Sequence, residues 1–261
     1  MTGEDKRRKA ALREMLRRQS CQQMRLMDEE RALAGGTGDL RSRIPEPEVM
    51  DQEEMLAFMR NNRPIRDNNQ GEVIKPFLHL CPSFSMEGTL LDLGCATGEL
   101  SIYMSLVFPR LSITAVDASP GCIEEAQKLA NHFNLANPPE FIRAHLPDDK
   151  LSSRKFDTVF SRSTLHHFQR GGDFWKVVKR HGKSGGTVYA YDLARPITRR
   201  GAELLVDGAL MPNAPEVNRR IYMRSFMAAY RPAEVRLDLE ACGLRGLRVE
   251  PLQPSLSLIH I

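Results

Sequence analysis

One stretch of this 261-residue chain, TLLDLGCATGELSIY over residues 89–103, constrains the fold more than any other. It begins with a short apolar run, Thr89 to Leu93, that contains a single carboxylate at Asp92. Small residues follow over 94–98, and from Glu99 onward apolar residues recur at helical spacing. A strand, a tight turn and a helix in this order bring a ligand close to bare backbone at a helix N-terminus.

The spacing of the small residues distinguishes between two kinds of ligand. A dinucleotide-binding turn has the pattern Gly-x-Gly-x-x-Gly, whose later glycines admit the pyrophosphate and let the helix pack on the strand. Counted from Gly94, those two places are held by Ala96 and Glu99. A carboxylate at the start of the helix would repel a pyrophosphate. The spacing therefore disfavours a nicotinamide oxidoreductase.

Asp92 through Gly98 instead resembles motif I of the class I S-adenosylmethionine-dependent methyltransferases, which reads acidic-x-Gly-x-Gly-x-Gly. Ala96 is the one departure from that pattern. The apolar run Leu111–Val116 ends at Asp117, where the family holds an acidic residue at the end of its second strand. One carboxylate there can accept hydrogen bonds from both hydroxyls of a ribose. The resemblance covers about residues 71–194 and 232–261.

The resemblance implies an α/β fold with a doubly wound, seven-stranded sheet that is mostly parallel and has an antiparallel last strand. It implies S-adenosyl-L-methionine as the cofactor. The residues expected to bind it lie in the first turn and after the next three strands: Asp92, Gly94, Cys95, Ala96, Gly98, Asp117, Ala118, Ala144, His145, Leu146, Ser161 and Arg162.

His166 and His167 are the candidate catalytic residues, because an imidazole can take a proton from a hydroxyl or amine near neutral pH. The alternative is that they only pack in the structure, since alignment of the reactants alone can drive methyl transfer. The surrounding loop, 161–168, lacks the motifs of relatives that methylate base amino groups, protein arginine or catechols. The expectation is a metal-free enzyme with a small-molecule substrate.

Charge and cysteine content limit the other possibilities. The net charge of +4 resides in the first 20 residues, which hold seven lysines and arginines against three acidic residues. Nucleic acid is therefore not the expected partner of the catalytic domain. The five cysteines are scattered and form no C-x-x-C pair, which is typical of a reduced, cytoplasmic protein without a disulfide framework or zinc site. No apolar run is long enough to span a membrane.

The chain divides into two regions. Residues 1–70 are expected to form a helical arm and a lid over the cofactor, although the lid helix could simply pack on the core; the Met-rich first helix is a candidate for homodimer pairing. Residues 71–261 are expected to form the methyltransferase domain, with a helical cap inserted at 195–231. Aromatic residues recur in this cap, and arginines exceed acidic residues there. Both an aromatic and an anionic substrate therefore stay open.

The resulting hypothesis is an S-adenosylmethionine-dependent methyltransferase that acts on a small molecule, at an oxygen, nitrogen, carbon or sulfur atom. Two alternatives stay open. The first is an RNA or protein methyltransferase that uses the basic N-terminal arm. The second is a non-catalytic subunit that keeps the methyltransferase fold for interaction.

Overall fold

The computed structural model of the chain describes residues 43–46, 54, 57, 74, 77–78, 81, 83–147, 151–210, 215–253 and 256–260. Most of the arm and lid region predicted for residues 1–70 lies outside the described residues. The same holds for the first helix, and so for the dimer contact expected there. Only the short segment 43–46 and positions 54 and 57 of that region enter the account below.

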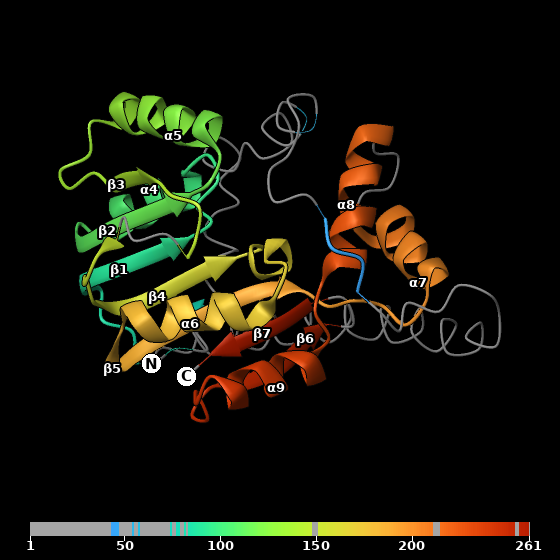
Figure 1. Ribbon diagram of the computed structural model, residues 1–261. Coiled ribbons are helices and arrows are strands. Elements are labelled where there is room, and N and C mark those ends of the chain that lie inside the picture. The colour runs from blue at the N-terminus through green and yellow to red at the C-terminus, as the bar shows by residue number, and fades with distance from the viewer. Residues whose placement is uncertain are drawn as a thin grey trace, which may run out of the picture.

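A parallel sheet forms the centre of the molecule, in the order β3-β2-β1-β4-β5 (Figure 1). A hairpin, β7-β6, extends this sheet, and its strand β7 runs antiparallel to β5. The strands are β1 (Glu87–Leu93), β2 (Arg110–Asp117), β3 (Glu140–Arg143), β4 (Phe156–Arg162), β5 (Gly182–Leu193), β6 (Arg248–Gln253) and β7 (Leu256–His260). The predicted α/β architecture with a parallel sheet is confirmed.

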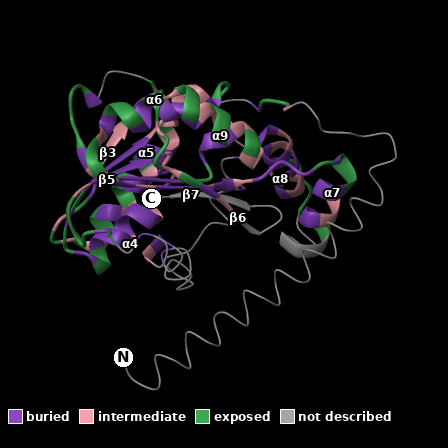
Figure 2. Ribbon diagram, turned by 90° about the horizontal axis from the view of Figure 1, so that it is seen from below, coloured by how far each residue is buried: buried purple, intermediate pink, exposed green. Residues whose placement is uncertain are grey.

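Helices cover both faces of the sheet, with α6 and α9 on one side and α4 on the other (Figure 2). Their bounds are α4 (Glu99–Val107), α5 (Pro120–Phe133), α6 (Gly171–His181) and α9 (Pro232–Ala241). Strands buried on both faces read as continuous apolar runs. This explains the sequence of β1, where Leu90 packs into the core on the α4 side and Leu91 into the core on the α6 side.

The order of the strands positions the site. The chain winds from β1 outward to β3, then returns to β4 on the other side of β1. In open α/β sheets a ligand binds at such a reversal, beyond the carboxyl ends of the strands. The arrowheads of β1 and β4 point towards the helices of the cap (Figure 1).

The segment after β5 is helical. It contains α7 (Arg199–Leu204), a π-helical turn (Leu205–Leu210) and α8 (Glu216–Ala228). These elements have a small core of their own, in which Met223 and Phe226 are buried. Arg195 fixes the base of the cap, because its buried guanidinium donates to Ala229 O (2.7 Å) and to Glu234 Oε1 (2.5 Å).

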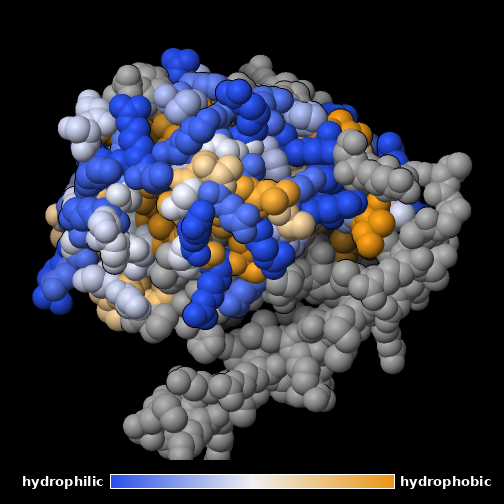
Figure 3. Space-filling model, turned by 60° about the horizontal axis from the view of Figure 1, so that its bottom comes forward, coloured by the Kyte–Doolittle hydropathy of each residue, from blue (hydrophilic) through white to orange (hydrophobic). Residues whose placement is uncertain are grey.

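The face shown in Figure 3 is largely hydrophilic, with apolar side chains in smaller patches. Among the helices in the described part of the chain, we find none with the length and apolar character needed to cross a bilayer.

Candidate functional site

The turn after β1 brings backbone and side chains into close contact. Gly94 has φ +75°, and a Cβ on it would lie 2.1 Å from Thr164 Oγ1. Gly98 also has φ +75°, and a Cβ there would lie 2.7 Å from the side chains of Ala126 and Phe141. Both positions therefore require glycine, for conformation and for space. Ala96, which replaces the middle glycine of the motif, likewise takes a positive φ of 48°.

Asp117 ends β2 beside this turn, and the backbone fixes its carboxylate. Oδ2 accepts a hydrogen bond from Ala96 N and Oδ1 accepts one from Ser119 N, both at 2.9 Å. Burial raises the pKa of this carboxyl above its ordinary value, although these bonds oppose the shift. A carboxylate has about four lone-pair sites, so this side chain keeps acceptor capacity for a ligand.

Asp92 is a second buried carboxylate at the same edge of the sheet. Its Oδ2 accepts a hydrogen bond of 2.5 Å from Ser101 Oγ on α4. Burial raises the pKa of Asp92 to about 7, and the nearby charge of Asp117 acts in the same direction. Burial also raises the pKa of Glu99. Three carboxyl groups with raised pKa values thus favour a cationic ligand, because a cation stabilises their ionised forms.

A cavity of about 400 Å³ opens beside these carboxylates, within the size range of small-molecule sites. The predicted cofactor residues that line it are Asp92, Gly94, Cys95, Ala96, Asp117, Ala118, Ala144, His145, Leu146 and Arg162. Two predicted residues do not line it. Gly98 packs against α5 and β3, and buried Ser161 donates its hydroxyl to Leu93 O at 2.9 Å.

The opposite end of the cavity is formed by the cap. Helix α8 contributes Asn218, Ile221, Tyr222 and Ser225. None of these was singled out as a site residue, apart from Tyr222 as part of an aromatic repeat. The three aromatic residues of this repeat have different surroundings in the structure. Tyr222 lines the cavity, Phe226 lies in the cap core, and Tyr230 donates its hydroxyl to Phe168 O.

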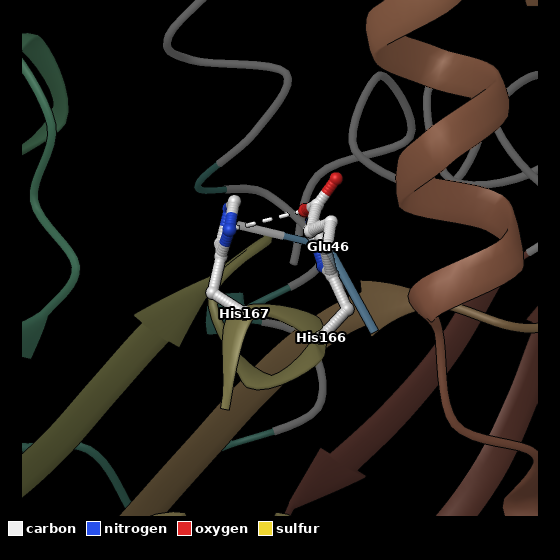
Figure 4. Close-up of side chains that lie close together, drawn as sticks. All are labelled: Glu46, His166 and His167. Carbon is white, nitrogen blue, oxygen red and sulfur yellow. Dashed lines mark ion pairs between the residues drawn. The ribbon is translucent and has the colours of Figure 1, made fainter. Parts of the chain in front are cut away.

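His166 and His167 form a short 3-10 turn after β4, and both line the cavity. His166 Nδ1 lies 2.5 Å from Asp192 Oδ1 on β5, and its Nε2 lies 3.3 Å from Glu46 Oε1. His167 Nδ1 lies 3.0 Å from the same Glu46 oxygen. Figure 4 shows the two imidazole rings and the Glu46 carboxylate converging.

The two imidazoles differ in charge at neutral pH. Burial alone lowers the pKa of His166, but the carboxylates of Asp192 and Glu46 outweigh it and raise the pKa to about 10. Burial and the adjacent positive ring of His166 lower the pKa of His167 to about 4. In this arrangement His166 already carries its proton, whereas His167 is neutral.

Glu46 reaches this cluster because the segment 43–46 is fastened to the turn after β4 and to the end of α8. The Arg43 guanidinium donates to the carbonyls of His166 (2.5 Å), Phe168 (2.8 Å) and Gln169 (2.9 Å). It also lies 4.3 Å from the centroid of the Tyr230 ring. Sequence analysis did not identify Glu46 or Asp192 as site residues.

Comparison with known proteins agrees with this geometry. Residues 91–190 match a family model described as Methyltransferase domain. The malonyl-[acyl-carrier protein] O-methyltransferase of Hahella chejuensis is 29% identical over 167 residues, 63% of this chain and 54% of that protein. The mitochondrial ubiquinone biosynthesis O-methyltransferase of Schizosaccharomyces pombe is 32% identical over 112 residues, 42% of this chain and 40% of that protein. The chain thus spans about half, or less, of these curated relatives.

A solved structure of the plantazolicin methyltransferase BpumL in complex with SAH has a similar fold. It superposes with a TM-score of 0.63 at 14% sequence identity, covering 90% of this chain and 98% of that one.

The fold, the cavity at the strand reversal and the matched domain define a class of protein. Residues 91–190 of this chain form a methyltransferase domain, and the fold is that of S-adenosylmethionine-dependent methyltransferases. The site fits that cofactor, since Gly94 leaves no side chain in the turn and the carboxylates of Asp92 and Asp117 suit a cationic ligand.

Proposed function

We propose that this protein transfers a methyl group from S-adenosylmethionine to a small-molecule acceptor. The observation that carries the proposal is the continuous cavity from the turn after β1 to helix α8, with the fixed carboxylate of Asp117 on its wall. The cofactor supplies an electrophilic methyl group. The names of the two curated relatives, both O-methyltransferases, support an oxygen acceptor without excluding nitrogen, carbon or sulfur.

Each wall of the cavity has a proposed role. Asp117 accepts hydrogen bonds from the ribose hydroxyls, and Ala144, His145 and Leu146 hold the adenine. Asp92 lies at the inner end beside α4, where it favours the cationic part of the cofactor. Gly98 and Ser161 are packed behind the cavity wall, so their proposed role is to hold the wall residues in place.

The acceptor is proposed to bind at the cap end, against Tyr222, Ile221 and Asn218. An aromatic or mixed polar molecule suits these side chains better than a strongly anionic one. The cap has more arginines than acidic residues, but this excess is weak support for an anionic substrate. Two of these arginines are already paired, Arg195 with Glu234 and Arg219 with Asp207. Among the described residues, the one arginine on the cavity wall is Arg162, at the end of β4.

A base is not required by this proposal. Alignment of the acceptor with the methyl group in a water-poor cavity can supply on the order of 7–11 kcal/mol of the barrier. The proton-accepting role predicted for His166 and His167 stays a hypothesis. A reduced, cytoplasmic setting is likewise proposed, supported by the free thiols of Cys81, Cys95, Cys122 and Cys242.

The proposal is tested by incubating the purified full chain with methyl-labelled S-adenosylmethionine and separate small-molecule, RNA and protein fractions of a host extract. We expect label in the small-molecule fraction, and we expect it to persist after deletion of residues 1–38. Label in RNA or protein that depends on those residues would favour the macromolecular alternative. Cofactor binding without transfer to any fraction would favour a non-catalytic subunit.

A pH dependence follows from the raised pKa of Asp92, about 7. Asp117 and burial favour its protonated form, whereas Ser101 and Arg162 favour the ionised form. A cationic ligand stabilises the ionised form, so cofactor affinity is expected to fall as the pH drops through about 7, by up to about tenfold per pH unit. Calorimetric titration on either side of this value measures the slope. The slope should flatten in Asp92→Asn, and an unchanged slope there would contradict the assignment.

A further inference from the structure

We propose that Glu46, His166 and His167 form a binding site for a divalent transition-metal ion such as Zn²⁺ at the wall of the cavity. One ligand atom from each residue lies within 4.8 Å of the other two. The fastened segment 43–46 brings Glu46 to the 3-10 turn that carries both histidines (Figure 4). This departs from the metal-free expectation, which rested on the lack of a metal-binding aspartate after β4.

The spacing of the ligand atoms suits a four-coordinate ion. Glu46 Oε1 lies 3.0 Å from His167 Nδ1 and 3.3 Å from His166 Nε2. Tetrahedral ligands that bind zinc at about 2.0–2.1 Å stand roughly 3.3 Å from one another. Two imidazole nitrogens and one carboxylate form a donor set found in catalytic metal sites, which keep a further position open. Because both imidazoles line the cavity, that open position would face it.

Neighbouring residues hold two of the three ligands from behind. His166 Nδ1 lies 2.5 Å from Asp192 Oδ1, and a metal-binding histidine typically donates its second ring N–H to a carboxylate in this way. A bound ion would displace the proton from Nε2, whose lone pair would then ligate it. Ser225 Oγ lies 3.4 Å from Glu46 Oε2 and 3.5 Å from Oε1, and Arg224 Nε lies 3.8 Å from Oε2. Oε1 is the carboxylate oxygen that also contacts both imidazoles.

The third ligand provides an independent observation. Nδ1 of His167 is buried and has no hydrogen-bond partner in the described part of the chain, although it lies 3.0 Å from Glu46 Oε1. Buried polar nitrogens are otherwise paired in folded proteins, so each exception calls for an explanation. A metal ion bound at Nδ1 would provide the missing partner.

The competing explanation is a metal-free ion-pair bridge, in which protonated His166 joins Glu46 to Asp192. The two explanations differ over His167. The bridge needs only His166 and its two carboxylates, whereas a metal ion needs the nitrogens of both histidines. Removal of His167 therefore distinguishes them.

The test is a titration of the chelator-treated, full-length protein with Co²⁺, followed by displacement with Zn²⁺. We expect one ion per chain and the visible absorption of four- or five-coordinate Co²⁺. His167→Ala and Glu46→Gln are expected to weaken binding at least 100-fold, and Asp192→Asn about 10- to 100-fold. His132→Ala, at an exposed position on α5, is the matched control and should bind as the wild type does.

Saturation without these absorption bands, or equal binding by the wild type and His167→Ala, would overturn the metal site and leave the ion-pair bridge. Circular dichroism checks that each variant is folded, and His167→Gln replaces His167→Ala if the latter is not. The titration contains neither cofactor nor acceptor. A failed metal site is therefore distinguishable from a failure of the proposed methyl transfer.

Discussion

Asp117→Ala is expected to weaken S-adenosylmethionine binding by at least 100-fold. The carboxylate lines the cavity, and backbone N–H groups of Ala96 and Ser119 fix both of its oxygens. Two hydrogen bonds from ribose hydroxyls to a charged acceptor are worth about 1.5–3 kcal/mol each. Losing both corresponds to a factor of about 10²–10⁴ in the dissociation constant. Isothermal titration of the cofactor measures this change directly.

Two further variants show whether charge, position or general damage causes the effect. Asp117→Asn should also bind poorly, because its amide NH₂ would face one of the two backbone donors. Asp207→Asn removes an exposed carboxylate that pairs with Arg219 outside the cavity, and it should bind the cofactor normally. Wild-type affinity in Asp117→Ala, with the fold intact, would remove Asp117 from the site.

The sequence predicted the parts of the site that are formed by short, continuous segments of the chain. The turn after β1 and the acid at the end of β2 each belong to a short segment whose residue types have a physical reason. Position 94 requires glycine because its φ is positive and because Thr164 leaves no room for a Cβ. The contact with Thr164 is visible only in the folded structure. Gly98 was expected in the cofactor site for the same local reasons, but it serves the packing of α5 and β3.

The remaining parts of the site depend on contacts between distant segments, which spacing cannot reveal. Glu46 stands between two prolines in the sequence, and nothing nearby indicates that it meets His166 and His167. Asp192 lies near the end of β5, and nothing next to it in the sequence indicates that it holds a histidine ring on the neighbouring turn. The inward face of α8 was equally hidden, because periodicity indicates an apolar face without saying whether it covers a core or a cavity.

The histidine pair illustrates the same limit in electrostatic terms. From the sequence both residues are equivalent candidates for accepting a proton. In the structure the two carboxylates around His166 raise its pKa, whereas burial and the charge of His166 lower the pKa of His167. The difference arises from residues that are remote in the chain, so no reading of the local motif could have separated the two rings.

Gly94→Ala is expected to destabilise the protein by about 2–5 kcal/mol. A left-handed backbone costs a residue with a Cβ roughly 1–2 kcal/mol, and overpacking adds about 1–3 kcal/mol. The new Cβ would lie 2.1 Å from Thr164 Oγ1 and 2.4 Å from Thr164 Cγ2. Thr164 is β-branched and stiff at χ1, so it cannot easily rotate away. Urea denaturation gives the change in the free energy of unfolding.

Gly185→Ala is the matched control, because Gly185 has φ +74° against +75° at Gly94, and a Cβ there meets no atom of the described residues within 4 Å. It should lose only the conformational part, about 1–2 kcal/mol. In the double variant Gly94→Ala/Thr164→Ala the two closest clashes disappear, while the Thr164 Cβ contact at 2.8 Å persists. Part of the stability should therefore return. Equal losses in Gly94→Ala and Gly185→Ala would mean that Thr164 does not restrict the turn, and the close packing at the carboxyl end of β1 would then not explain why glycine is needed there.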